Sequence, residues 1–261
     1  MSLFEAIIIA IVEGLTEYLP VSSTGHMIIT SSLMGIHTDE FTKLYTVAIQ
    51  LGAILAVVAL YWRKFFDFTR WQFFLKLVIA VIPALLLGFL FSDAIDSMLE
   101  SPLTVAITLL AGGIVLLFID RLFTRNTLDA EPGITNKQAF VTGVWQCLAM
   151  IPGMSRSAAS IIGGMQQGMT RRLAAEFSFF LAVPTMFAAT GYKLLQGYET
   201  FTSEHIKFLV VGNIVAFIVS ILAIKFFIGF LQKYGFKIFG WYRIIAGLIL
   251  LVLIWKDVIV E

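Results

Sequence analysis

The chain has 261 residues, of which 59% are hydrophobic and 13% are charged. Soluble domains carry about 25% charged residues, so this composition excludes a mainly aqueous surface and indicates an integral membrane protein. The net charge of +1 predicts no nucleic-acid partner, and the single cysteine, Cys147, excludes an internal disulfide and a cysteine-rich metal site.

The first element in chain order is an apolar segment, about 3–34, that is interrupted by LPVSSTG at residues 19–25. Neither half alone is long enough to cross roughly 30 Å of hydrocarbon, which takes about 20 helical residues. We therefore interpret the segment as a re-entrant helical hairpin. It lacks a basic n-region, and Glu13 and Glu17 lie where a signal peptide would be cleaved, so we expect it to stay in the mature fold.

Six apolar stretches are long enough to span a bilayer, three on each side of a polar linker. They lie at about 44–62, 73–92, 103–120, 173–192, 207–229 and 239–255. The linker covers residues 126–138 and is followed by a second interrupted segment, about 139–168, which contains IPGMSRS. We interpret this segment as a second re-entrant hairpin.

The two halves of the chain have the same order of elements, a hairpin followed by three spans. Aligning VEGLTEYLPVSSTG with WQCLAMIPGMSRSA pairs Glu13 with Gln146 and, after a one-residue gap, Pro20 with Pro152 and Ser23 with Ser155. A hairpin returns to its own side of the membrane whereas three spans do not, so the second half begins on the opposite face. We predict an all-α integral membrane protein of two inverted repeats, residues 1–125 and 139–261.

Lysine and arginine gather in cytoplasmic loops, so they indicate the orientation. Basic residues occur in 62–72, 121–138 and 230–238, whereas 93–102 has three acidic residues and no basic one. This pattern places both ends of the chain outside the cytoplasmic membrane. The first hairpin then enters from outside and the second from the cytoplasm, so their interrupted parts should meet near the midplane.

We call residues 17–25 tip one and residues 150–158 tip two. At each tip a proline and hydroxyl-rich turn should end one short helix and start the next, so backbone N–H groups and positive helix ends face the gap between the tips. Arg156 adds a forked cation that suits phosphate oxygens. The candidates for phosphate binding are Ser22, Thr24, Gly25, Gly153, Ser155, Arg156 and Ser157. Helix capping or packing would explain any single serine or glycine here equally well, but not Arg156.

Tip one also carries candidate acid and base groups. His26 lies three positions after Ser23, so on a helix its imidazole could take a hydroxyl proton from that serine. Glu13 and Glu17 lie one turn apart on one face, and two buried carboxylates repel. We expect one of them to be protonated, or the pair to be neutralised by Arg156, by backbone donors or by a divalent cation, Mg²⁺ or Ca²⁺. Spacing does not separate an acid role from a metal-binding or structural one.

Glu176 is a third acidic residue in an apolar stretch. It would either orient Arg156 or His26, or serve as a charge near a helix start after Arg171 and Arg172.

Two function classes fit a membrane-embedded phosphate site. One is a phosphatase for a lipid-linked phosphate whose apolar tail lies between helices. The other is a transporter or flippase for a lipid-linked or small anionic phosphate, because inverted repeats with broken helices are also transporter architecture. A carrier needs no nucleophile or general base, so the set of Ser23, His26 and the acids favours the enzyme.

The motifs EGLTEYLPVSSTGHM and PGMSRSAAS, followed by EFSFFLAVP, resemble those of the bacterial undecaprenyl-diphosphate phosphatase family, also called bacitracin-resistance proteins. The resemblance covers essentially the full chain. It implies hydrolysis of undecaprenyl diphosphate to undecaprenyl phosphate and inorganic phosphate, which supplies the lipid carrier for peptidoglycan synthesis. It also implies an active site that opens to the outer face of the cytoplasmic membrane.

The same resemblance implies roles for individual residues. Glu13 and Glu17 match the paired acids of the family, Ser23 its proposed nucleophile, His26 its histidine and Arg156 its phosphate-binding arginine. A divalent cation is also associated with the family. Ser160 stands where the family commonly has threonine, which keeps the hydroxyl. A homodimer stays open as a further partner.

Overall fold

The computed structural model describes residues 1–99, 101–197 and 202–259. Glu100, one of the acidic residues of the loop that we expect on the outer face of the membrane, is not among the described residues. Within these ranges the chain is helical, and its only β-type pairing is an isolated parallel bridge between Leu128 and Met169. The α-helices are α1 (Leu3–Thr16), α2 (Ser23–Leu33), α3 (Glu40–Ala48), α4 (Gln50–Leu60), α5 (Trp62–Phe65), α6 (Trp71–Leu90), α7 (Ser92–Leu99), α8 (Pro102–Leu122), α9 (Asn136–Gln146), α10 (Arg156–Gln166), α11 (Arg171–Gln196), α12 (Ser203–Tyr234) and α13 (Lys237–Trp255), and the short 3₁₀ helices are η1 (Glu131–Gly133) and η2 (Cys147–Met150).

Six segments of the described chain are long and apolar enough to cross a membrane, which confirms the predicted number and order of spans. They are Glu40–Leu60, Trp71–Leu90, Pro102–Leu122, Arg171–Gln196, Ser203–Tyr234 and Lys237–Trp255. Each overlaps the stretch predicted for it. The protein is therefore a multi-pass, all-α membrane protein.

The first span is divided at Ile49 into α3 and α4, a break that the sequence analysis did not predict. Its cause lies in another helix, because the Gly52 N–H donates to Oδ1 of Asn213 on α12 at 2.7 Å. The first turn of α4 is thus capped by a side chain about 160 residues away in the chain. The break places Gln50 at the start of a new helix.

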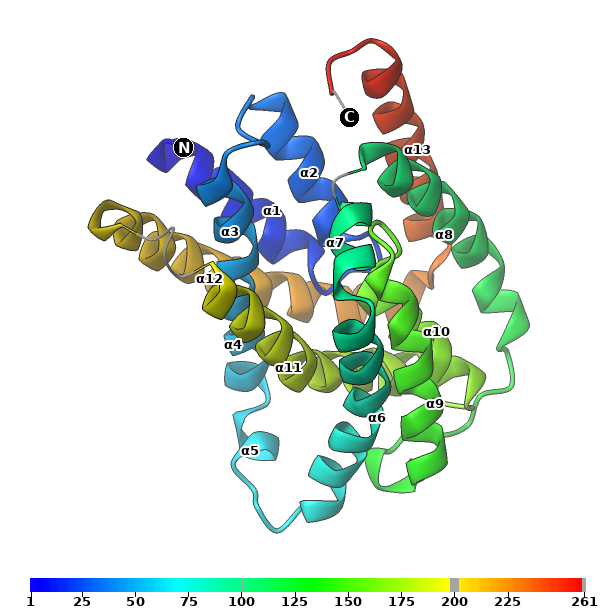
Figure 1. Ribbon diagram of the computed structural model, residues 1–261. Coiled ribbons are helices and arrows are strands. Elements are labelled where there is room, and N and C mark those ends of the chain that lie inside the picture. Colours follow the sequence, from blue (N-terminus) through cyan, green and yellow to red (C-terminus); the bar gives the residue numbers. More distant parts are fainter. Residues whose placement is uncertain (100, 198–201, 260–261) are drawn as a thin grey trace.

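The two predicted hairpins form two pairs of short helices, α1 with α2 and α9 with α10. In Figure 1 the N and C termini and the first pair lie at the upper end of the molecule, whereas α5 and the start of α9 lie at the lower end. The turn between α1 and α2 and the turn before α10 both lie inside the body of the bundle.

Each pair packs on the other half of the chain. Helix α1 packs on α12, and α9 packs on α6, while α8 packs on α13 and α4 on α11. Glycines allow the first two contacts, because a Cβ at Gly14 would overlap Val219 of α12 and one at Gly143 would overlap the Ala80 carbonyl of α6. The first helix of each hairpin therefore contacts the middle span of the opposite half.

The buried core lies beside the two tips and is rich in phenylalanine. Tyr18 follows directly on Glu17, and its ring meets Phe179 of α11 edge to face at a centroid distance of 5.2 Å. The Tyr18 hydroxyl also donates to the Ala53 carbonyl of α4 at 2.8 Å. These contacts fix the chain at the start of tip one.

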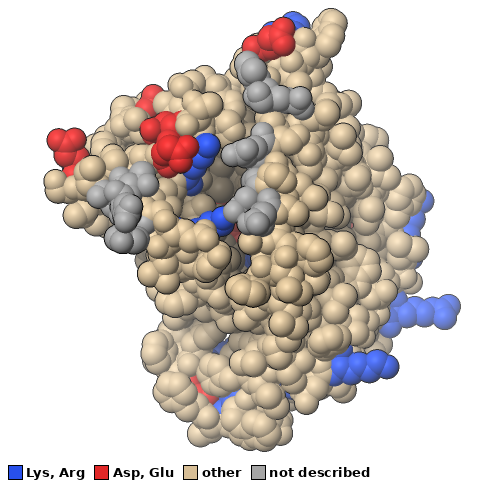
Figure 2. All heavy atoms as spheres, in the orientation of Figure 1, with Lys and Arg blue, Asp and Glu red and all other residues tan. Residues whose placement is uncertain are grey.

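Charged side chains lie mainly at the ends of the molecule. Figure 2 shows them around the upper end and along the lower and right-hand edges of this face, with a wide uncharged band between and a hollow in its upper half.

The linker is held by α6. The buried Lys76 of α6 donates to the Glu131 and Pro132 carbonyls of the linker at 3.2 Å. The linker thereby packs on α6.

Candidate functional site

The two tips have nearly the same backbone geometry. Ser22 is the N-cap of α2 with φ 73° and ψ 95°, and Ser155 is the N-cap of α10 with φ 70° and ψ 113°. Each hydroxyl accepts the N–H three residues ahead, of Gly25 and of Ala158, at 3.3 Å. A positive φ is strained for serine, so both caps are held by their surroundings.

This geometry corrects the alignment of the tips. Ser22, rather than Ser23, is the counterpart of Ser155, and Ser23 therefore corresponds to Arg156, since each is the first residue of its helix. Tip two has one more residue between its proline and its cap. Gly153 accommodates that residue with φ 86°, in the left-handed region that glycine adopts without strain.

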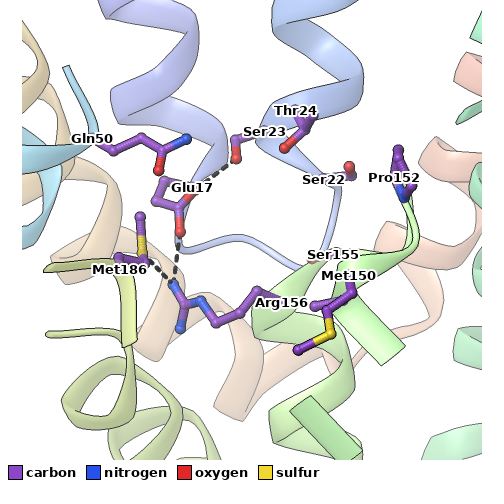
Figure 3. Close-up of a pocket in the computed structure, with 12 residues that line it drawn as sticks. Glu17, Ser22, Ser23, Thr24, Gln50, Met150, Pro152, Ser155, Arg156 and Met186 are labelled. Carbon is purple, nitrogen blue, oxygen red and sulfur yellow. Dashed lines mark hydrogen bonds and ion pairs between the residues drawn. The ribbon is translucent and has the colours of Figure 1, made fainter. Parts of the chain in front are cut away.

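A cavity of about 130 Å³ lies between the tips. Figure 3 shows the residues around it, which come from tip one, α2, α4, η2, tip two, α10 and α11. They are Glu17, Ser22, Ser23, Thr24, Gln50, Ala149, Met150, Pro152, Gly153, Ser155, Arg156 and Met186. Most of the predicted phosphate-binding residues are thus brought together, whereas Gly25 and Ser157 do not line the cavity.

Glu17 is at the centre of the polar contacts. Ser23 Oγ donates to Glu17 Oε2 at 2.6 Å, and Arg156 Nη2 donates to Glu17 Oε1 at 2.8 Å (Figure 3). Glu17 and Ser23 are buried, and the Arg156 side chain is only 12% exposed. A hydroxyl, a carboxylate and a guanidinium therefore form one chain of charge-assisted hydrogen bonds that joins the two tips.

Arg156 is fixed from α11 as well as from tip one. Its Nη1 donates to the Ser178 carbonyl at 2.9 Å, and its guanidinium carbon lies 5.7 Å from the centroid of the Tyr18 ring. Its buried Nε has no hydrogen-bond partner among the described residues. The guanidinium is thus held in place, and its Nε–H group is still available to donate a hydrogen bond.

The tips are also joined through their backbones. Ser157 Oγ donates to the Leu19 carbonyl at 2.8 Å, so this predicted phosphate-binding residue serves as a link between tips in the structure. Thr108 of α8 donates its hydroxyl to the Pro152 carbonyl. The first contact joins the tips at the carbonyl before Pro20, and the second holds the carbonyl of Pro152 against α8.

Arg243 of α13 holds both tips, and the sequence analysis missed it. It is completely buried and donates to the carbonyls of Pro20 in tip one, Gly153 and Met154 in tip two, and Thr108 and Leu109 in α8, at 2.8–3.4 Å. The signal was present, because Arg243 is the only charged residue in the apolar stretch 239–255. A charge inside a membrane span marks a buried polar partner.

Glu13 lies one turn before Glu17, as predicted, but it does not line the cavity. It is fully buried, and neither carboxylate oxygen has a hydrogen-bond partner among the described residues. A buried carboxylate without a partner is costly, so it calls for a proton or a cation.

His26 lies on α2 within one turn of Ser23, as predicted, but its ring contacts other groups. Its Nδ1 lies 2.7 Å from the Ser22 carbonyl oxygen and its Nε2 lies 2.6 Å from the Tyr242 hydroxyl, with the two rings stacked at 5.5 Å. Ser23 instead donates to Glu17, so the expected contact between Ser23 and His26 is absent from this structure. The helical spacing was right, but the imidazole turns toward α13.

Glu176 contacts neither Arg156 nor His26. It accepts from Arg172 Nε at 3.1 Å and lies 3.8 Å from Lys64 Nζ. Of its two predicted roles, the structure supports the charge near the helix start.

Comparison with known sequences gives a consistent result. Residues 6–249 match the model of a family described as bacitracin resistance protein BacA. A protein of Flavobacterium psychrophilum is 57% identical over 97% of this chain and 96% of its own, one of Porphyromonas gingivalis is 52% identical over 99% of both chains, and one of Aquifex aeolicus is 42% identical over 95% of this chain and 97% of its own. All three carry the name undecaprenyl-diphosphatase.

Proposed function

Because the chain belongs to the bacitracin resistance protein BacA family, we propose that it is a membrane phosphatase that hydrolyses undecaprenyl diphosphate to undecaprenyl phosphate and inorganic phosphate. The observation that carries the proposal is the chain from Ser23 through Glu17 to Arg156 at the cavity. A transporter or flippase for an anionic phosphate needs the cation but not a hydroxyl bonded to a carboxylate. The site therefore favours the enzyme.

In the proposed reaction the terminal phosphoryl group lies between the two tips. Arg156 binds its oxygens, and the N–H groups in the first turns of α2 and α10 receive charge as it develops. The apolar prenyl chain stays among the membrane-facing helices. Binding in this place replaces part of the ion pair between Arg156 and Glu17 with contacts to phosphate.

Ser23 then attacks the terminal phosphorus in line, and Glu17 accepts the hydroxyl proton over their 2.6 Å hydrogen bond. A bond from Ser23 Oγ to phosphorus forms as the bond from phosphorus to the bridging oxygen breaks, and undecaprenyl phosphate leaves. Glu17 passes the serine proton to the departing undecaprenyl phosphate and is again a carboxylate. Water then attacks the phosphoserine while Glu17 accepts a proton from that water, and Glu17 returns this proton to Ser23 Oγ as the bond from Oγ to phosphorus breaks and inorganic phosphate is released. Attack by water without a phosphoserine is the alternative, with Ser23 as a hydrogen-bond donor only.

A divalent cation, Mg²⁺ or Ca²⁺, fits the chemistry of Glu13 and Glu17. Carboxylate oxygens are the ligands that these cations prefer, and Mg²⁺ commonly takes one or two carboxylates together with substrate phosphates. The two unpartnered oxygens of Glu13 are consistent with such a ligand. When bound by these carboxylates, the cation would neutralise charge on the paired acids beside the cavity.

We also propose that the two halves are inverted repeats whose hairpins enter the cytoplasmic membrane from opposite faces, with the site open to the outer face. The exchange of contacts supports this, since α1 packs on α12 as α9 packs on α6. The positions of the termini and of α5 at opposite ends agree with it (Figure 1). The homodimer stays a prediction.

Thiol labelling tests the orientation in a variant with Cys147 replaced by serine. Cysteines at Ser97 and Lys207 should react with an impermeant reagent added to intact cells, and a cysteine at Lys233 should react only after lysis. All three residues are exposed, so access is decided by the side of the membrane. The reverse pattern would place the first hairpin on the cytoplasmic side.

The activity is tested with purified, detergent-solubilised protein and undecaprenyl diphosphate. We expect release of one inorganic phosphate per lipid, with undecaprenyl phosphate as the other product. The assay is run with Mg²⁺, with Ca²⁺ and with chelator. If phosphate is released under none of these conditions, the proposal of a phosphatase is wrong and the proposal of a carrier remains.

A further inference from the structure

Gln50 is the one carboxamide among the residues that line the cavity, and the sequence analysis did not select it. It lies within a predicted span, where a glutamine is easily taken for a packing residue. The break at Ile49 makes it the first residue of α4. Because that break is held by Asn213 of α12, the position of Gln50 is built into the fold.

The orientation of the Gln50 amide follows from its one hydrogen bond. Thr190 of α11 donates its hydroxyl to Gln50 Oε1 at 3.4 Å, which directs the amide oxygen toward α11. The amide nitrogen has no hydrogen-bond partner within the described ranges. Figure 3 shows the side chain reaching from α4 toward Glu17 at the edge of the cavity.

An amide is the suitable donor at this place. A lysine or arginine beside Glu17 would compete with Arg156 for the carboxylate that already accepts from Ser23. A carboxylate would repel both Glu17 and a phosphate. The neutral N–H₂ group donates to a phosphoryl oxygen without changing the charge of either partner.

We propose that Gln50 is a substrate-binding residue that donates from Nε2 to a phosphoryl oxygen of the diphosphate head group. This inference rests on the proposed function. In it, Arg156 binds the head group from tip two while Gln50 binds it from α4, and Thr190 holds the amide in the orientation that donates. The diphosphate is thus contacted by three structural units, the two tips and the break in the first span.

Another glutamine provides a matched control. Gln146 ends α9 and donates from Nε2 to Thr185 Oγ1 of α11 at 3.1 Å, so it also pairs with a threonine of that helix. Gln146 does not line the cavity. The two glutamines therefore share side-chain chemistry and partner type, and they differ in access to the substrate.

The test compares Gln50→Leu, Gln50→Glu, Thr190→Val and Gln146→Leu in phosphate release from undecaprenyl diphosphate. We expect Gln50→Leu to lower kcat/KM by roughly 10- to 100-fold, because a hydrogen bond to a charged group is lost. The isosteric Gln50→Glu should lose more, since it adds repulsion. Thr190→Val should lose less than Gln50→Leu, and Gln146→Leu should stay within about threefold of the parent.

Binding of inorganic pyrophosphate, measured by calorimetry, gives a second readout that does not depend on turnover. Gln50→Leu should weaken it, and Gln146→Leu should not. Each variant is compared as a monodisperse peak in gel filtration, and Gln50→Glu replaces Gln50→Leu if the latter does not fold. If the parent is active while Gln50→Leu and Gln50→Glu both keep its kcat/KM, the inference about Gln50 is wrong and the proposed phosphatase activity is retained. If the parent itself releases no phosphate, the proposed function fails first.

Discussion

The serine caps of tip one and tip two have nearly the same backbone geometry, but the side chains beside them differ in chemistry. Both start a helix from a serine cap with positive φ, and both caps accept from the third residue of the helix. At the first helical position, however, tip one has Ser23 and tip two has Arg156. Further back, tip one has Glu17 at the cavity, whereas no carboxylate of tip two lines it.

The difference teaches how a repeated frame makes an asymmetric site. The shared caps aim two helix N-termini at one cavity, which suits any anion. The divergent side chains then place the proposed nucleophile, Ser23, and the carboxylate at one tip and the cation at the other. In the proposed reaction a symmetric pair of tips would bind phosphate, and only the asymmetric pair would bring a reacting hydroxyl to it.

Replacing Ser23 gives the largest expected effect, because it removes the reacting group from tip one. Ser23→Ala should lower kcat by roughly 10³-fold or more while binding of inorganic pyrophosphate persists, since a nucleophile acts in the transition state. Rapid acid quenching of the parent with terminally labelled substrate should detect label on the protein. A substantial residual kcat in Ser23→Ala would leave water as the attacking species.

Arg156→Lys should come next, because it keeps the charge of tip two but removes the planar fork. The lysine can bond either Glu17 or phosphate as a point charge, so we expect kcat/KM to fall roughly 10²-fold. The matched control is Arg172→Lys, at an exposed arginine that pairs with Glu176 outside the cavity. Near-parent turnover in Arg156→Lys would show that tip two contributes a positive charge and that the planar fork of donors is not needed.

His26 tests the corrected geometry of tip one. Because it bonds the Ser22 carbonyl and Tyr242, we expect it to hold the turn and not to take the Ser23 proton. His26→Ala should then cost less than Ser23→Ala, and Tyr242→Phe less again, about threefold to tenfold in kcat. Equal losses in His26→Ala and Ser23→Ala would restore the histidine as the base.

The serine caps give the smallest effect and test whether the tips are equivalent. Glycine adopts positive φ without strain, so Ser22→Gly and Ser155→Gly should change the free energy of unfolding by only a few tenths of a kcal/mol. Alanine keeps the strain and loses the cap, and should cost about 1–2 kcal/mol at either tip. Thermal unfolding in detergent measures both. Unequal losses of unfolding free energy in the two alanine variants would argue against equivalent caps at the two tips.

Much of the fold could be predicted because it depends on local composition. Apolar length predicted the six spans, and the polar interruptions predicted two pairs of short helices and pointed to Ser23, Glu17 and Arg156. The proposal that the tips bind an anion follows from proline, hydroxyls and arginine in short stretches. These signals need no knowledge of what lies next to them in space.

The features that were missed depend on distant contacts. The break at Ile49 needs Asn213, the turn of His26 needs Tyr242, and the pairing of Ser155 with Ser22 instead of Ser23 needs a register that proline spacing does not give. Gln50 became visible only once the break placed it at the cavity. Arg243 is the exception, because a lone charge in an apolar stretch could have been selected from the sequence.

The five carbonyl contacts of Arg243 have a consequence for how the site is made during synthesis. Arg243 follows Pro20 by 223 residues and Gly153 by 90 residues, so both tips are translated long before the side chain that joins them. Until α13 inserts, the carbonyls of both turns lack their shared donor. The nascent protein therefore lacks these five contacts while its early helices enter the bilayer, and Arg243 joins the two tips only once α13 is in place.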